Sequence, residues 1–70
     1  MKVREVIRIL EVNGFRQVRQ TGSHRRFEGV VGGRTRLVTV AGNTGEEVSV
    51  GTLASIRRQS GLPRRLFRSD

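Results

Sequence analysis

The apolar residues at the start of the chain recur with the period of an α-helix. They occupy positions i, i+3, i+4 and i+7 and are Val3, Val6, Ile7 and Leu10. The Asn13-Gly14 pair that follows is typical of a helix end, because both residue types tolerate a left-handed backbone. The spacing predicts a helix over residues 2–13 whose apolar stripe has to be covered by another part of the chain.

The next segments carry β-forming residues separated by turn residues. Residues 15–20 and 24–28 are expected to be extended, with a Thr-Gly-Ser turn at residues 21–23 between them. Gly32-Gly33 indicates a second turn, and residues 34–40 ("RTRLVTV") are rich in β-branched side chains. Three consecutive strands most simply form an antiparallel meander.

A loop and a second helix follow the predicted strands. Residues 41–50 show little periodicity and are expected to lead into a helix with Ser49 as its N-cap. Leu53 and Ile56 supply an apolar pair for that helix, and Gly61 followed by Pro63 is typical of its end.

These elements define one small domain. The predicted fold class is α+β in the order α-β-β-β-α, a three-stranded antiparallel sheet with two helices packed on one face and the other face open. Seventy residues allow only a small core. The segment after residue 62 either forms a basic tail or docks Leu66 and Phe67 on the domain, and the sequence leaves both open.

The charge of the chain favours an anionic partner. Lys and Arg number 14 against 6 Asp and Glu, which gives a net charge of +8. All but one of these cations are arginines, whose guanidinium can donate two hydrogen bonds to one phosphate. Nucleic acid is the favoured partner, while an arginine-rich genome or a role in solubility would explain the same composition.

The composition also bears on location and on cofactors. Charges at positions 2, 4, 5 and 8 interrupt any signal-peptide core, and no apolar run approaches the roughly 20 residues of a membrane span, so a cytoplasmic protein without membrane contact is expected. The chain has no cysteine and one histidine, which disfavours a zinc site. Glu46 and Glu47 are adjacent in sequence and rarely converge on one metal, so no metal and no cofactor are expected.

The only histidine lies in the segment "VRQTGSHRRF" of residues 18–27. Burial of Phe27 would turn His24 and Arg26 toward the open face, because side chains alternate along a strand. If Val18 faces the helices, Gln17 and Arg19 join that open face. Burial of Val38 and Val40 would leave Thr35, Leu37 and Thr39 there as well. A β-bulge would reverse such an assignment.

This predicted face could bind phosphate and transfer protons. Histidine exchanges a proton near neutral pH, and cleaving RNA by internal attack needs a base, an acid and cations that stabilise the phosphate charge. Predicted RNA contacts are Arg19, Arg25, Arg26, Gly22 for close backbone approach and Ser23 as a donor. Arg57 and Arg58 form either a phosphate clamp or a solvated helix face, and the clamp is favoured because Arg25 and Arg26 already suggest a basic surface. From the residues alone, His24 is a catalytic group, a non-catalytic contact or an ordinary exposed residue, and no carboxylate partner for it is evident.

Four blocks of the chain resemble the HicA toxins of bacterial and archaeal toxin–antitoxin modules, which are mRNA interferases related to the double-stranded RNA-binding fold. The blocks are "KVREVIRILEVNGF", "VRQTGSHRRF", "LVTV" and "GTLASIRRQSGL", and they span about residues 2–62. The resemblance implies the same α-β-β-β-α fold, with His24 as the catalytic histidine of the G-S-H block. It assigns residues 1–62 to the ribonuclease domain and 63–70 to a basic C-terminal tail.

The function implied by this resemblance is that of a toxin that cleaves mRNA as an endoribonuclease. A HicB-like antitoxin would neutralise it in a hetero-oligomer, and we expect the cleavage to be metal-independent. A non-catalytic double-stranded RNA-binding module and a binding-only subunit with a protein partner are the alternatives. Two segments depart from the family, since "AGNTGEEV" and "SVGTL" stand where many relatives have proline with basic residues and "PKGTL". RNA specificity or partner choice would change if that loop contacts either one.

Overall fold

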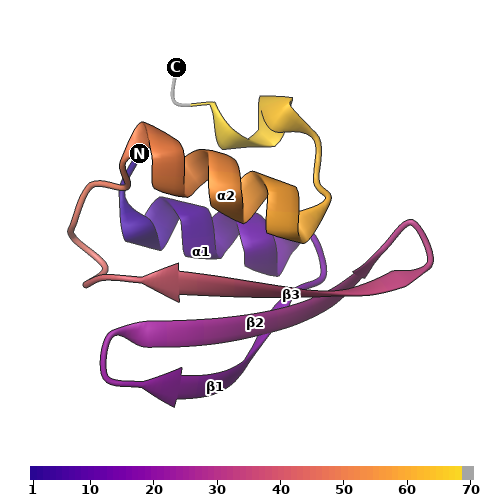
Figure 1. The fold of residues 1–70 in the computed structure, drawn as a ribbon, viewed down its shortest axis with the longest axis horizontal. Helices are drawn as coiled ribbons and strands as arrows, with labels where there is room; N and C mark the ends of the chain where they lie inside the picture. Colours follow the sequence, from indigo (N-terminus) through magenta and orange to yellow (C-terminus); the bar gives the residue numbers. More distant parts are fainter. Residues whose placement is uncertain (69–70) are drawn as a thin grey trace.

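The computed structural model describes residues 1–68 of the chain. Its elements in chain order are α1 (Val3–Val12), β1 (Arg16–Thr21), β2 (His24–Val31), β3 (Arg34–Ala41), α2 (Val50–Ser60) and the 3₁₀ helix η1 (Arg64–Phe67). Within those residues the three strands form one antiparallel sheet in the order β1-β2-β3, and α1 and α2 lie on the same side of it (Figure 1). The predicted α+β fold class is confirmed, and the arrangement is consistent with a double-stranded RNA-binding-domain-like fold.

The core lies between the helices and one face of the sheet. Phe27 of β2 and Val38 of β3 are cross-strand partners at its centre and are both fully buried. The buried hydrophobic residues are Val3, Val6, Leu10, Phe15, Phe27, Val38, Val40, Ile56 and Phe67. The β2–β3 register runs without a break, so the predicted alternation on these two strands is confirmed.

The prediction for β1 is wrong at one position, because the strand contains a bulge. Gln17 pairs with Phe27 and Arg19 pairs with Arg26, which leaves Val18 as an extra residue between two ladder positions. Gln17 therefore lies on the helix side and not on the open face, whereas Arg19 lies on the open face as expected. Val18 is 45 % exposed, so it is not part of the core. Every residue of β1 is exposed, so the core does not fix which way this edge strand turns.

The connection between β3 and α2 caps the first helix. The amide of Val3 donates to the carbonyl of Glu46 at 2.9 Å, and the amide of Arg4 donates to the carbonyl of Thr44 at 3.0 Å. The first amides of a helix have no partner within the helix, so this loop satisfies them. The segment that showed no periodicity is thus held by hydrogen bonds to residues that lie 40 and 43 positions earlier in the chain.

Gly29 of β2 is required by the packing of an aromatic ring. A Cβ atom at this position would lie 2.7–2.9 Å from ring atoms of Phe15, closer than carbon atoms can approach. We expect Gly29→Ala to lower the free energy of unfolding by about 1–3 kcal/mol, because the ring or the strand would have to move.

Urea denaturation followed by circular dichroism would measure this change. Gly51→Ala is the matched control, since Gly51 lies in α2 with open space around it. That control should stabilise the protein by about 0.5–1 kcal/mol, because alanine is the better helix former. Equal stability of Gly29→Ala and the wild-type protein would contradict this packing.

The segment after Pro63 is docked and not a free tail over the residues that the structure describes. η1 packs against α1 and α2, and Phe67 is only 5 % exposed. Leu66 is partly buried against the same core. Ser69 and Asp70 of the predicted tail lie outside the described residues.

No helix within residues 1–68 is both long and apolar enough to span a membrane.

Candidate functional site

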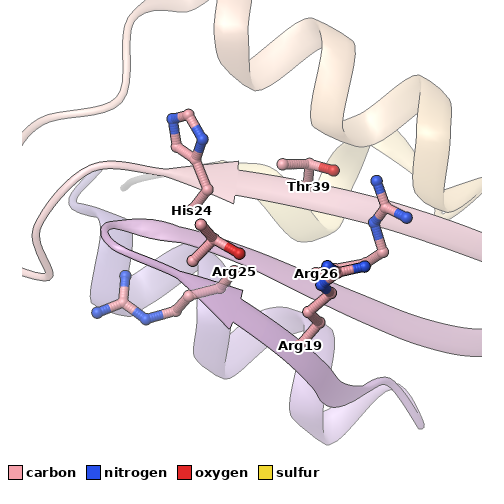
Figure 2. Close-up of a pocket in the computed structure, with 6 residues that line it drawn as sticks. Arg19, His24, Arg25, Arg26 and Thr39 are labelled. Atoms are coloured by element: carbon pink, nitrogen blue, oxygen red, sulfur yellow. The ribbon is translucent and has the colours of Figure 1, made fainter.

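A shallow pocket lies on the open face of the sheet, beside the turn that joins β1 to β2. Its volume is about 220 Å³. The residues that line it are Arg19, Thr21, His24, Arg25, Arg26 and Thr39 (Figure 2). All three strands therefore contribute to one pocket. Four of its residues are basic, and the two threonines each pair with a basic residue across the ladder.

His24 is the first residue of β2 and is held by a two-residue turn. Thr21 and His24 pair directly across Gly22 and Ser23, and Gly22 has a left-handed φ of 60°. The carbonyl of Ser23 accepts a hydrogen bond from the amide of Gly42 at 3.1 Å, which ties the turn to the end of β3. The imidazole is exposed, while the backbone of His24 pairs with Thr21 on one side and with Ala41 on the other.

Two rows of side chains cross the open face at this point. One row is Thr21, His24 and Ala41, and the next is Arg19, Arg26 and Thr39. Rows on one face lie about 7 Å apart along a strand, so the imidazole and the guanidinium groups can reach a common ligand. Neither Arg19 nor Arg26 forms an ion pair within the described part of the chain. The pocket is therefore suited to an anion held beside a group that can transfer a proton.

Arg25 differs from its neighbour Arg26 in the direction of its side chain. It pairs with the buried Val40, and its Nη1 donates to the carbonyl of Gly42 at 3.0 Å. Figure 2 shows its guanidinium directed away from those of Arg19 and Arg26. Arg25 borders the pocket, and its guanidinium is engaged in holding the loop after β3.

The two arginines predicted on the second helix are not part of this pocket. Arg57 and Arg58 belong to α2, and neither of them lines the pocket around His24. Arg57 lines a different pocket together with Arg64 and Arg68. The structure therefore brings together Arg19, His24 and Arg26 and leaves Arg57 and Arg58 apart from them.

No carboxylate lines the pocket around His24. Glu28 is the acidic residue of β2 on the same face, but four strand positions place it about 13 Å from His24. Within residues 1–68 no three His, Cys, Asp or Glu side chains come together as metal ligands would. The other polar side chains that line the pocket are those of Thr21, Thr39 and the three arginines.

Thr21 is a pocket residue that the sequence interpretation assigned to the turn. A two-residue loop places the residues on either side of it directly opposite each other. A loop of only Gly22 and Ser23 predicts Thr21 opposite His24, which is the pairing in the structure.

Comparison with known protein families adds an independent finding. The sequence model of one family, described as "HicA toxin of bacterial toxin-antitoxin", matches residues 3–62 of the 70-residue chain. This span includes all six residues of the pocket. No curated protein matches the chain.

Proposed function

The chain belongs to the HicA toxin family, and on that premise we propose that it is an endoribonuclease that cleaves mRNA with His24 as its catalytic residue. The match confirms the resemblance drawn from the sequence and makes the protein a toxin of a toxin–antitoxin system. The observation that carries the proposed activity is the exposed imidazole beside Arg19 and Arg26, on a sheet face that the helices leave open.

The proposed reaction is internal attack on the RNA backbone. His24 takes the proton of a 2′-hydroxyl, and the 2′-oxygen attacks the adjacent phosphorus as the bond from phosphorus to the 5′-oxygen breaks. The products are a 2′,3′-cyclic phosphate and a 5′-hydroxyl. Since no carboxylate lines the pocket, the proton on the leaving oxygen comes from the imidazolium or from water.

Arg19 and Arg26 are the proposed phosphate ligands. Their charges lie in the row next to His24 and would stabilise the negative charge that builds up on the phosphate during attack. Gly22 and Ser23 are proposed to let the RNA backbone approach the turn. Arg57 and Arg58 remain predicted RNA contacts without support from this pocket, because they lie on the helix layer.

The proposed partner is a HicB-like antitoxin that covers the open face. Val18, Val30 and Leu37 are large hydrophobic residues that are exposed there or at its edge strand. A protein that buried them would gain apolar contacts next to the pocket and would close access to His24. The loop of residues 41–50, which is less basic than the family pattern, lies at the end of β3 and is proposed to affect partner choice.

Incubation of the purified protein with RNA in excess EDTA tests the proposed activity. Cleavage is expected, since no step of the proposed reaction uses a metal ion. A folded protein that binds double-stranded RNA without cutting any RNA would instead be the non-catalytic binding module.

Arg26 and Arg25 are expected to differ in RNA binding. In a His24→Ala background that prevents cleavage, Arg26→Gln should reduce the slope of log affinity against log salt concentration by about one unit, because one phosphate contact is lost. Arg25→Gln should change that slope less and should lower stability by about 1 kcal/mol, because the carbonyl of Gly42 loses its donor. Binding measured by fluorescence anisotropy at several salt concentrations checks both. An equal reduction of the slope by the two variants would contradict the assignment.

A further inference from the structure

A second hollow lies in the helix layer, between α2 and η1. It has a volume of about 380 Å³. Its apolar lining comes from Val50, Leu53 and Ala54 of α2 and from Phe67 of η1. Arg57, Arg64 and Arg68 line it as well. We refer to these residues as the α2–η1 groove.

The groove exists because α2 carries two stripes. Ile56 and Ser60 face the core and are almost completely buried. Val50, Leu53, Ala54 and Arg57 follow the spacing i, i+3, i+4 and i+7 and form a second stripe along the helix, in which Leu53 is partly buried against the core. Phe67 is buried beside this stripe, whereas Val50 is 87 % exposed. The core therefore does not need Val50, and the stripe is only partly covered.

We propose that the α2–η1 groove binds an acidic segment of a partner protein, one that presents aliphatic side chains at helical spacing. The three guanidinium groups form no ion pair within residues 1–68, and they adjoin an apolar surface. Glutamate or aspartate side chains of such a segment would pair with the arginines while its aliphatic side chains contact Val50 and Leu53. Eight residues of α2 extend about 10 Å, which matches two turns of a partner helix.

Two other occupants fit the groove less well. A second copy of the chain is disfavoured by charge, because each copy carries +8. Single-stranded RNA would need a ring face for stacking or polar side chains for base edges. Phe67 is 5 % exposed and offers no free face, and no Asn, Gln, Ser or Thr lines the groove.

The groove is independent of the proposed ribonuclease site. The pocket around His24 and the α2–η1 groove share no lining residue. α2 approaches that pocket through Gln59, whose Oε1 accepts the backbone amide of Thr39 at 3.0 Å, and Gln59 does not line the groove. A partner in the groove would therefore leave the face that holds His24 accessible. Binding of an acidic segment in the groove does not depend on whether the protein cleaves RNA.

Nuclear magnetic resonance of the ¹⁵N-labelled full chain tests the proposal. The probe is a synthetic 14-residue peptide with leucines at i, i+3, i+4 and i+7 and glutamate or alanine elsewhere, and the control peptide has serine in place of each leucine. We expect the leucine peptide to shift amide signals of α2 and η1, and the serine peptide to bind about tenfold or more weakly because it buries no aliphatic side chain.

A matched pair of variants locates the binding. Val50→Asp should weaken binding of the leucine peptide about tenfold, because it removes an apolar contact and repels the acidic peptide. Val12→Asp makes the same change at another highly exposed valine, on α1, and should leave the affinity within about twofold of wild type. Amide spectra of both variants show whether they are folded.

Four results would overturn the proposal. They are equal binding of the two peptides, shifts centred on residues 19–26, no shift at millimolar peptide, and tighter binding of a 12-nucleotide RNA than of the leucine peptide in the groove. Self-association of the labelled chain through α2, seen as concentration-dependent shifts without peptide, would favour a second copy as occupant and would likewise overturn it.

Discussion

Replacing His24 with alanine is expected to reduce the rate of RNA cleavage by roughly 10²- to 10⁴-fold, because the group that takes the 2′-hydroxyl proton is removed. The side chain is exposed and is not part of the core. The variant should therefore fold normally and keep its affinity for RNA, since Arg19 and Arg26 remain.

Cleavage of an end-labelled RNA in excess EDTA gives the rate, and anisotropy gives the affinity. Arg34→Ala is a suitable control, because it removes an exposed cation beside the other hairpin turn and away from the pocket. This control should cut RNA at nearly the wild-type rate. Cleavage by His24→Ala at the same rate as the control would remove His24 from the mechanism.

Replacing Phe27 with alanine is expected to have the largest effect on stability. Phe27 is fully buried at the centre of the sheet, and loss of a buried phenyl ring costs about 3–5 kcal/mol. A 70-residue domain has little stability in reserve, so much of this variant should be unfolded at 37 °C.

Leu37→Ala is the matched control for Phe27→Ala. Leu37 lies in the neighbouring row of β3 but on the open face, and it is 50 % exposed. We expect its loss to cost less than about 1 kcal/mol. Thermal and urea denaturation followed by circular dichroism compare the two variants. Similar costs for both would show that the core does not lie between the helices and Phe27.

Local patterns were sufficient for the helices and for two of the strands. The Oγ of Ser49 accepts the amide of Thr52 at 3.3 Å, and Gly61 ends α2 with a left-handed φ of 69°, as capping preferences predict. Phe27 and Val38 are buried, and their burial fixes the faces of β2 and β3. His24 could be placed on the open face for this reason.

Features that depend on distant contacts could not be predicted in the same way. β1 buries none of its residues, so no apolar pattern marks the bulge at Val18. The conformation of residues 42–49 depends on hydrogen bonds to the first residues of α1. The docking of Phe67 depends on a core that other elements form. Neither contact leaves a local signal in the sequence.

In the candidate site, too, local patterns predicted some features and contacts between distant residues determined the others. His24 and Arg26 are two positions apart and share a face, whereas the adjacent Arg25 turns to the carbonyl of Gly42. Arg57 was favoured as part of a phosphate clamp because other arginines suggested a basic surface, and the fold places it in the α2–η1 groove. Charge in the sequence identified basic residues, but strand register decided which of them lie beside the imidazole.

Analysis of the ends of the cleaved RNA by mass spectrometry tests the central claim most directly. The claim is that His24 and the neighbouring arginines promote internal attack by a 2′-hydroxyl. It predicts 2′,3′-cyclic phosphate and 5′-hydroxyl ends, and no cleavage at a position where one 2′-deoxynucleotide replaces the ribonucleotide. Fragments with 3′-hydroxyl and 5′-phosphate ends, or cleavage at the deoxy position, would contradict it.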